Sequence, residues 1–531
     1  MKNRPYPYYE LVQMRDMKDM VEKRAEENAD ETAFSWSEGK ELKKKTYREY
    51  KDDIDALGTY LYSEGVKDTH IAIVAENSYE WLVAFLAILN GGNVAAPVDK
   101  ELPAERKCEL IKQADSTAVF VSSKYKEDVK AAGVREFDIE ELGGYIEKGK
   151  KLISGGDTSF TSYKVDREKL AAIFFTSGTT GKSKGVMLSQ KNIIEDINAS
   201  CKHFVPSEGD TIAALPFNHS FGLMTTVYCV FNYKKVVYIN RSLKSIQKDL
   251  QLVKPGTLLV VPLFVETFYK IIRNNVKKKN MEKKLAAGGR ISNALLAVGI
   301  DKRRSMFKEL IDGLGGNLSS IISGGAALDP KYVKAFRTWG IEVLPGYGIT
   351  ECAPVISVNR NEYWRDGSVG PALPGCEVKI SDEGEILAKG DNVMMGYYKD
   401  EEETAKVIKD GWFHTGDLGY IDKDGFIFIT GRAKNLIILS NGENVSPEEI
   451  EAALMKDEEA IEEVVVYGEK GKLVAEIFPA EDHLGDQAYF DAVAAKWSKD
   501  QPSYKKIQKV VLRDKEFEKN STKKIIRYKI Q

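Results

Sequence analysis

Residues 176–185 combine glycines, hydroxyl side chains and lysines in a pattern that could bind a polyphosphate. They follow the apolar run 171–175 and read Thr176, Ser177, Gly178, Thr179, Thr180, Gly181, Lys182, Ser183, Lys184 and Gly185. Glycines allow close backbone approach, hydroxyls and backbone N–H groups donate to phosphate oxygens, and lysines add positive charge. A Walker A loop needs four residues between its glycines, whereas Gly178 and Gly181 are separated by two. The stretch therefore predicts a different phosphate-binding loop, with a flexible surface loop as the alternative.

Two later segments offer groups that suit a nucleotide. One contains Gly324, Gly325 and Ala326, which are small enough to let a flat ligand approach the backbone. The other follows the next predicted strand and consists of Tyr347, Gly348, Ile349, Thr350 and Glu351. An aromatic ring can stack on a base, a hydroxyl can reach a phosphate, and a carboxylate can hold Mg²⁺ with few other protein ligands. We interpret Glu351 as a magnesium ligand, with a surface acid as the alternative.

Together these segments resemble the signatures of the adenylate-forming superfamily, which includes acyl-CoA synthetases, luciferases and peptide-synthetase adenylation domains. The resemblance covers nearly the whole chain from about Thr46. It implies that residues 176–185 bind the β- and γ-phosphates of ATP, that residues 324–326 contact adenine, and that Glu351 binds magnesium at the reaction centre. Among the branches of the superfamily, GYGITE, ISGGAALDP and GENVSPEEIE look most like fatty acyl-CoA synthetases.

Three further residues gain a role from this resemblance. Asp417 matches the acid that accepts hydrogen bonds from both ribose hydroxyls, and a carboxylate suits a vicinal diol because its two oxygens accept in parallel. Arg432 matches the arginine near the same ribose. Lys434 matches the hinge between two domains, where the backbone must absorb a conformational change. The resemblance thus predicts a ribose site next to a hinge.

A histidine lies between aromatic residues just after a predicted strand. By itself His219 would more often be a satisfied polar contact, but the resemblance places it at the border of the carboxylate-substrate pocket. Peptide-synthetase members usually carry an acid near this point to hold an amino group. No acidic residue occurs between Thr211 and Tyr233, so an amino-acid substrate is disfavoured.

The C-terminal segment contains the lysine that we predict to be catalytic. Family members carry a glycine before this lysine and Ile-x-Arg after it, so Ile525 and Arg527 align it with Lys524. Lys523 occupies the glycine position, and the usual upstream proline is missing. Lys523 is therefore the alternative candidate for the catalytic lysine. The interpretation that assigns no site here is a basic C-terminal tail.

Strand and helix patterns alternate along most of the chain and predict the scaffold. Strand patterns occur at 70–76, 95–99, 117–123, 211–216, 236–240, 258–262, 320–323 and 341–344, and helical patterns at 81–89, 104–114 and 189–204. Such alternation indicates βαβ units and a parallel sheet. Past Ala353, short strands with Asp-Gly and Glu-Gly turns indicate a β-rich subdomain.

A second unit is predicted to begin close to Arg432. A small α/β pattern starts there, with a helix that begins at Ser446, Pro447 and Glu449 in a capping box. We predict an α/β protein with a large N-terminal domain of α/β subdomains plus a β-rich subdomain, followed by a small mobile α+β C-terminal domain. The predicted bounds are 1–431 for the adenylation domain, 432–434 for the hinge and 435–531 for the domain with the catalytic lysine.

Composition and charge exclude several classes of protein. The chain has 531 residues, too many for a single hydrophobic core, and 77 basic against 80 acidic residues give a net charge of −3. No overall field favours nucleic acid or an anionic membrane. Five cysteines without C-x-x-C spacing fit a reducing compartment. We find no N-terminal apolar segment typical of a signal peptide, and no apolar run reaches the ~20 residues of a membrane span, so we expect a cytoplasmic protein.

Residues 277–308 differ from their surroundings because clusters of lysine and arginine flank a stretch of small and apolar residues. The interpretation that we favour at this point is a solvated helical insertion. The alternative is a basic amphipathic face that makes weak contact with a membrane, which would make the protein membrane-peripheral.

These features predict an ATP-dependent acyl-CoA synthetase. It would convert a carboxylic acid, a medium- or long-chain fatty acid, to acyl-AMP with release of pyrophosphate and then transfer the acyl group to CoA, with ATP, Mg²⁺ and CoA required. An acyl carrier protein as acceptor and an aryl or alicyclic acid as substrate stay open. From another class, the chain would be a nucleotide-binding protein without catalysis, which Lys523 supports and Glu351, Asp417 and Arg432 oppose. No nucleic-acid partner is expected.

Overall fold

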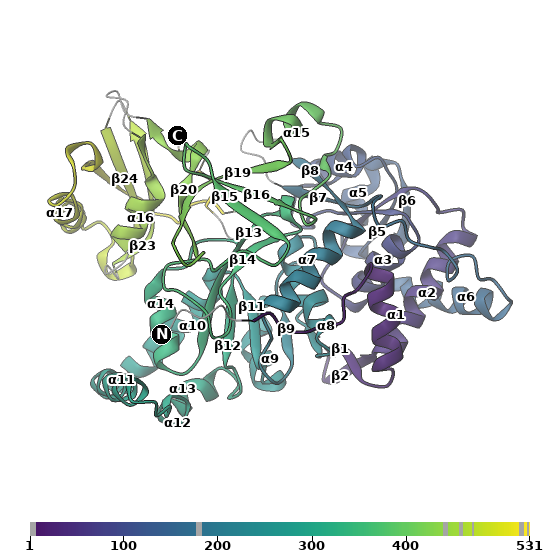
Figure 1. Ribbon diagram of the computed structural model, residues 1–531, viewed down its shortest axis with the longest axis horizontal. Coiled ribbons are helices and arrows are strands. Elements are labelled where there is room, and N and C mark those ends of the chain that lie inside the picture. Colours follow the sequence, from purple (N-terminus) through teal and green to yellow (C-terminus); the bar gives the residue numbers. More distant parts are fainter. Residues whose placement is uncertain are drawn as a thin grey trace.

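The protein is described from a computed structural model. The structure describes residues 7–176, 183–438, 444–455, 460–469, 472–519, 525–527 and 530. In Figure 1 a large part of the molecule extends from the N-terminus to β20, and the C-terminal strands and helices form a smaller part beside it. Sheets and helices are mixed throughout, so the predicted α/β class is confirmed.

The largest sheet carries the predicted phosphate loop. Its strand order is β17-β8-β7-β4-β3-β5-β6. The strands are β3 (His70–Val74), β4 (Val94–Pro97), β5 (Ser116–Val121), β6 (Arg135–Asp138), β7 (Leu170–Thr176), β8 (Lys184–Ser189) and β17 (Gly396–Tyr397). β3, β4, β5 and β7 are parallel as predicted, and β6, which was not predicted, also runs parallel. β8 runs antiparallel to β7, with Thr176 opposite Lys184. The glycine-rich loop therefore connects two antiparallel strands, and the sequence prediction did not include the second of them, β8.

Two four-stranded sheets continue the large part. One has the order β2-β1-β10-β9 and the other β11-β12-β13-β14. Their strands are β1 (Thr32–Glu38), β2 (Glu41–Thr46), β9 (Thr211–Ala213), β10 (Val237–Ile239), β11 (Thr257–Val260), β12 (Ser320–Ser323), β13 (Glu342–Gly348) and β14 (Val355–Val358). The parallel strands β12 and β13 end side by side, which brings the segments after Ser323 and around Tyr347 together. Parallel strands that end at one edge of a sheet are a common position for ligand sites.

The predicted β-rich subdomain is a five-stranded antiparallel sheet. It consists of β15 (Cys376–Ile380), β16 (Glu385–Gly390), β18 (Ile408–Lys409), β19 (Trp412–Ile421) and β20 (Ile427–Arg432). β19 and β20 are paired so that Asp417 lies opposite Arg432. The register of this pair therefore joins the two residues that we assigned to the ribose.

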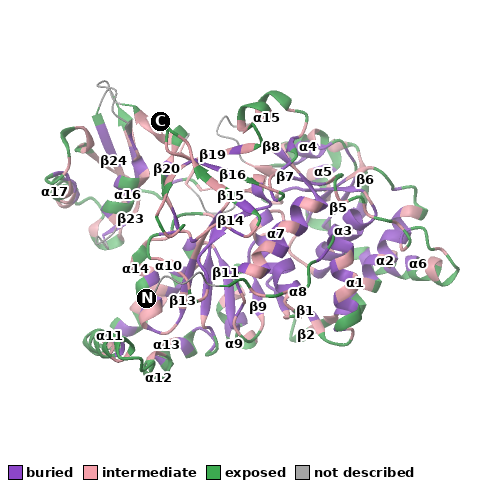
Figure 2. Ribbon diagram, in the orientation of Figure 1, coloured by how far each residue is buried: buried purple, intermediate pink, exposed green. Residues whose placement is uncertain are grey.

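Helices α3 (Tyr79–Asn90) and α7 (Gln190–His203) belong to the main hydrophobic core. Every residue of α3 except Glu80 is buried, as expected of a helix that is apolar on all sides. Ser189 caps α7 together with Asn192, in a reciprocal pair of side-chain hydrogen bonds. Figure 2 shows both helices as mostly buried. α7 is consequently a rigid support inside the large part.

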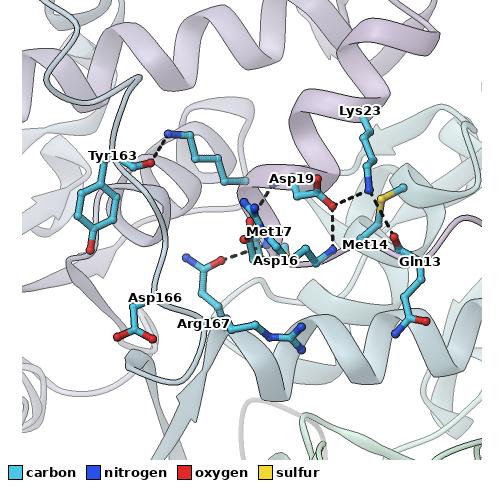
Figure 3. A network of polar contacts seen from close by, with 12 residues as sticks. Gln13, Met14, Asp16, Met17, Asp19, Lys23, Tyr163, Asp166 and Arg167 are labelled. Carbon is cyan, nitrogen blue, oxygen red and sulfur yellow. Dashed lines mark hydrogen bonds and ion pairs between the residues drawn. The ribbon is translucent and has the colours of Figure 1, made fainter.

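The N-terminal helix α1 (Met17–Glu27) is held by polar contacts against the loop between α6 (Leu142–Ser154) and β7. Lys18 Nζ donates to the backbone carbonyls of Phe160, Thr161 and Tyr163, at 3.3, 2.9 and 2.8 Å. Asp19 accepts from Lys23 Nζ at 2.9 Å on the other side of the helix (Figure 3). Desolvation lowers the pKa of Lys18, but three carbonyl acceptors satisfy the ammonium group. This network anchors the start of the chain.

The C-terminal part has its own hydrophobic core. Its main elements are α16 (Pro447–Met455), β23 (Ile461–Glu469), β24 (Lys472–Pro479), α17 (Gln487–Ser498) and β25 (Ile507–Leu512). It contacts the large part through an ion pair between Lys270 and Glu462, through Lys331 Nζ, which donates to Met455 O at 2.9 Å, and through Ser446 Oγ, which donates to Thr430 O of β20 at 2.9 Å. Few polar contacts of this kind suit two bodies that can change their relative orientation.

Four helices occupy the region that differs in composition. They are α10 (Pro262–Lys278), α11 (Glu282–Ala297), α12 (Arg303–Met306) and α13 (Lys308–Gly313). α11 lies at the periphery and is mostly exposed in Figure 2, and only Gly289 and Ser292 are buried in it. Within the part of the chain that the structure describes, no helix combines the length and apolar character needed to cross a membrane.

Candidate active site

The structure describes the two ends of the predicted phosphate loop, including Thr176 on one side and Lys184 on the other. Lys184 Nζ lies 2.5 Å from Glu403 Oε2 and 4.7 Å from the ring centre of Tyr397. Hydrogen bonds from Lys184 and Lys406 lower the pKa of Glu403 to about 2, so this carboxylate stays ionised. Of the other predicted phosphate ligands, Ser177, Gly178, Thr179, Thr180, Gly181 and Lys182 lie outside the described residues.

Tyr397 connects this lysine with Glu351. The Tyr397 hydroxyl donates to Glu351 Oε1 at 2.9 Å, while its ring faces Lys184. Burial raises the pKa of Tyr397, so the hydroxyl keeps its proton and acts as donor. Sequence reasoning missed Tyr397 and Glu403, because only the pairing of β17 with β8 brings these distant residues to the loop. Tyr397 therefore orients the Glu351 carboxylate and also contacts Lys184.

Asp417 is held by two of the other predicted residues. Its side chain is 3% exposed, Tyr347 OH donates to Oδ2 at 2.7 Å, and Arg432 Nε lies 2.7 Å from Oδ1. Burial raises the pKa of Tyr347, which keeps that hydroxyl protonated. Both oxygens of a buried carboxylate are therefore fixed in direction, and the structure brings Tyr347, Asp417 and Arg432 together.

Gly324 and Gly325 follow β12 directly and have no side chains. A Cβ atom on Gly324 would lie 3.0 Å from the ring of Phe221, and Gly325 has a φ of +85°, which favours glycine. Ala326 follows and is exposed. At Gly348 a Cβ atom would meet Pro354 O at 2.0 Å, so the end of β13 is also closely packed. These glycines are required because Phe221 and Pro354 pack directly against them, and their contact with adenine stays a prediction.

His219 lies in the loop between β9 and the π-helical segment η4 (Phe221–Cys229). Its backbone N–H donates to Pro216 O at 3.3 Å. The adjacent Ser220 donates from Oγ to Thr350 Oγ1 at 3.3 Å. This loop is therefore next to Thr350 and Glu351. π-Helical turns are rare and often occur at functional sites, but the sequence carried no signal for this one.

An apolar cavity extends from these segments into the large part of the molecule. The centre of a water-sized sphere can occupy about 80 Å³ of it. Its lining residues are Ser200, Phe204, Pro206, Phe221, Thr225, Cys229, Val230, Tyr233, Leu259, Ile322, Gly324, Gly325, Gly346, Tyr347, Gly348, Pro354, Val355 and Val358. One end is formed by the predicted adenine-contacting segments, and the remainder lies against α7 and η4. None of the described residues that line it carries a charge.

Helix α7 supports both the cavity and the loop of Glu351. Asn192 Nδ2 donates to the carbonyls of Asp391 and Val393, each at 2.8 Å, and Asp196 Oδ1 accepts from Val355 N–H at 3.1 Å. Desolvation raises the pKa of Asp196, which favours the neutral acid. Ser200, one turn further along, lines the cavity. One helix face thus positions the elements on two sides of the site.

Lys434 lies directly after β20 in the turn η7 (Ala433–Asn435). Desolvation and the positive charge of Arg432 lower the pKa of Lys434, and the carboxylates of Asp417 and Glu351 act in the opposite direction. Its ammonium group is therefore within electrostatic reach of the ribose and magnesium candidates. The prediction assigned Lys434 only a hinge role for its backbone. The sequence alone gave no sign that its side chain lies near Asp417 and Glu351.

The predicted catalytic lysine falls in an undescribed stretch. Lys524 and Lys523 lie outside the described residues, but Lys519 and Ile525 on either side form an antiparallel bridge. Arg527 forms an ion pair with Glu451 of α16, and Glu451 also accepts from Val466 N–H at 2.7 Å. The segment after the lysine is therefore anchored to the C-terminal core.

The residues around Glu351 suit a magnesium ion that is shared with a nucleotide. Among the described residues no group of three or more His, Cys, Asp or Glu side chains is arranged to hold a metal by itself. Mg²⁺ is commonly bound through one or two carboxylates and substrate phosphates. Glu351, linked through Tyr397 to Lys184 at the start of β8, fits this mode.

Comparison with known proteins agrees with this geometry. The sequence profile of the family described as AMP-binding enzyme matches residues 21–398, and the profile described as AMP-binding enzyme C-terminal domain matches residues 434–531. The long-chain-fatty-acid–CoA ligase 5 of Rattus norvegicus is 29% identical over 490 residues, which cover 83% of this chain and 71% of the relative.

Two further proteins resemble this chain: a relative named for an acyl-carrier-protein acceptor, and a solved structure. A chloroplastic long-chain-fatty-acid–[acyl-carrier-protein] ligase of Arabidopsis thaliana is 28% identical and covers 82% of this chain and 72% of its own. The fold matches O-succinylbenzoate coenzyme A synthetase from Bacillus subtilis in complex with ATP and magnesium, with a TM-score of 0.75, 22% identity and coverage of 96% and 98% of the two chains. Because the family profile matches most of its length, the chain belongs to the AMP-binding enzyme family.

Proposed function

We propose that this protein is an ATP-dependent fatty acyl-CoA synthetase that acts on a medium- or long-chain fatty acid. The carboxylate oxygen attacks the α-phosphorus of ATP, pyrophosphate leaves, and the thiol of CoA then attacks the acyl carbon so that AMP leaves. The uncharged cavity between α7 and η4 is the observation that carries the proposal. An apolar tail fits it without leaving a charge unpaired, whereas an amino-acid or dicarboxylic tail would not.

In this proposal, Asp417 accepts from the ribose hydroxyls while Tyr347 and Arg432 hold its carboxylate in place. Both of the latter contacts are at 2.7 Å, so little reorganisation is needed when the nucleotide binds. The glycine-rich loop holds the β- and γ-phosphates, which leave as pyrophosphate. Glu351, oriented by Tyr397, holds Mg²⁺, which when bound would neutralise charge on the phosphates.

Lys524 is proposed to stabilise the negative charge that develops on the α-phosphoryl oxygens. It comes from the small domain of residues 435–531, and residues 432–434 form the hinge between this domain and residues 1–431. The second step needs space for a thiol where Lys524 had been. Rotation at the hinge provides this space, and the contacts of Lys270, Lys331 and Ser446 across the two domains would break as it occurs.

Related alternatives concern the acid and the acceptor. The Arabidopsis relative, which is named for an acyl-carrier-protein acceptor, keeps an acyl carrier protein open as the acceptor in place of CoA. An aryl or alicyclic acid would also fit an uncharged cavity. A nucleotide-binding protein without catalysis is the alternative from another class, and the ordered contacts of Glu351 and Asp417 argue against it.

Carboxylate-dependent release of pyrophosphate from ATP tests the proposal. A panel of fatty, aromatic and alicyclic acids would be compared, with CoA or a holo acyl carrier protein as acceptor. We expect the highest kcat/KM with a medium- or long-chain fatty acid and CoA. The highest value with an aromatic acid or with the carrier protein would replace the proposed substrate or acceptor. If no acid stimulates pyrophosphate release, the catalytic proposal is wrong.

A further inference from the structure

Helix α11 and the residues that flank it form a cationic surface segment. Residues 277–304 contain nine basic and two acidic side chains, a net charge of +7 in a chain whose total is −3. No acidic residue occurs from Lys283 to Ile300. An ordinary solvated helix intersperses both signs of charge, so this composition requires another explanation.

The cations of α11 have no internal role among the described residues. Lys283, Lys284 and Arg290 are exposed, and no ion pair within the described part of the chain involves them. By contrast, Arg303 and Arg304 nearby are used for structure, since Arg303 pairs with Asp301 and Arg304 donates to Leu318 O at 2.7 Å. The positive charge of α11 is therefore available to an external partner.

Apolar side chains are exposed among these cations. Ile291 is 55% exposed, Val298 73% and Ile300 47%. At 100° per residue, Lys283, Arg290, Ile291 and Val298 lie within one half of the helix circumference, together with Ala287 and Ala294. Such exposure of several aliphatic side chains near one another is unfavourable in water and marks interaction surfaces.

The opposite face of α11 fixes this surface in its outward direction. Gly289 and Ser292 are buried, and Leu285 packs against the core that contains Phe336 and Trp339. The Cβ position of Gly288 is 3.5 Å from the ring of Phe307, so α11 lies close to its neighbours. The apolar outer residues cannot turn inward without breaking these contacts.

We propose that α11 and its flanking residues dock the protein on an anionic lipid membrane. A helix with lysine and arginine beside aliphatic residues, lying parallel to the surface, matches the chemistry of an interfacial amphipathic helix. Anionic headgroups pair with Lys283, Lys284 and Arg290, while Ile291 and Val298 enter the boundary between headgroups and acyl chains. A membrane provides both kinds of contact over the length of α11, and this inference does not depend on the proposed catalytic function.

The test is flotation of the intact protein with vesicles of phosphatidylcholine, with or without phosphatidylglycerol. We expect binding to the anionic vesicles that weakens as salt is added. The variant Lys283→Glu/Lys284→Glu/Arg290→Glu should bind at least on the order of 100-fold more weakly, because each basic residue near the surface contributes about a factor of five. Ile291→Ser/Val298→Ser should reduce the binding that remains at high salt.

Two matched variants control for net charge and for general hydrophobicity. Lys40→Glu/Lys151→Glu/Lys164→Glu changes the same total charge at exposed positions on other elements, and Leu243→Ser/Leu484→Ser removes two exposed aliphatic side chains elsewhere. Both should bind like the unchanged protein. Equal loss in the charge control, equal binding to vesicles without phosphatidylglycerol, or no vesicle binding at low salt would overturn the proposal. So would binding of the α11 surface to nucleic acid in preference to the vesicles. Circular dichroism and unchanged melting temperatures establish that every variant is folded.

Discussion

Replacement of Asp417 by alanine tests the ribose site most directly. A hydrogen bond to a charged group contributes about 1.5–3 kcal/mol, and the ribose offers two hydroxyls to this carboxylate. Loss of about 3 kcal/mol of binding would raise the apparent KM for ATP about 100-fold. The apparent KM for the fatty acid should change little, because Asp417 does not line the apolar cavity. The assay is pyrophosphate release with each substrate varied in turn.

The same substitution also affects stability, and this effect must be separated. The Asp417 side chain is 3% exposed, but that of Arg432 is 39% exposed and can be hydrated when it loses its partner. We therefore expect a cost of about 1–2 kcal/mol in the free energy of unfolding, less than for a fully buried pair. Asp422→Ala is the matched control, because Asp422 pairs with Arg365 and lies just after β19. A similar rise in KM for ATP in this control, or a larger rise for the acid than for ATP, would refute the reasoning.

Three other substitutions probe separate parts of the site, and a fourth tests a buried histidine. Lys524→Ala should abolish formation of the acyl-adenylate but leave transfer from supplied acyl-adenylate to CoA largely intact, and equal loss of both steps would reject its assigned role. Tyr397→Phe removes the hydrogen bond to Glu351 and should raise the Mg²⁺ concentration for half-maximal activity about tenfold, whereas an unchanged value would contradict the positioning role. Cys229→Phe fills part of the cavity and should lower kcat/KM for long acids relative to short ones; a uniform decrease would argue against a tail at this position. Burial lowers the pKa of His203 from 6.5 to about 4, so the unfolded state binds this proton more readily and stability falls by about 3 kcal/mol as the pH drops from 6.5 to 4. His203→Gln should flatten the pH dependence of urea unfolding in this range, and the same slope in both proteins would show that another group is responsible.

The sequence predicted most of the scaffold, because its strands and helices carry strong local patterns. The strand at 320–323 and the helix near 189–204 were located almost to the residue. β8 was missed because its six residues lie between a glycine-rich loop and a strong helical pattern. The adenine and magnesium candidates each follow a recognisable strand, whereas Asp417 and Arg432 were identified only from the resemblance, and the roles of all of them stay predictions.

Residues that act through long-range pairing could not be found in this way. Tyr397 reaches Glu351 only because β17 pairs with β8, more than 200 residues earlier in the chain. Asp196 looks like a polar residue of an amphipathic helix, and its contact with Val355 depends on how α7 packs against β14. Neither position carries a local pattern that distinguishes it from ordinary surface residues. Tertiary pairing supplies this information, and the amino-acid order near each residue does not.

The arrangement of side chains along α7 has a consequence for the divergence of this protein. Asn192, Asp196 and Ser200 are four residues apart, and about 12 Å of helix separates the first from the last. The first two hold backbone loops, and the third contacts the cavity. Substitutions near Ser200 can therefore alter which acid is accepted during evolution without disturbing the loops. An insertion or deletion of one residue would rotate one group by about 100° relative to the other, so this helix should tolerate changes of residue type but not of length.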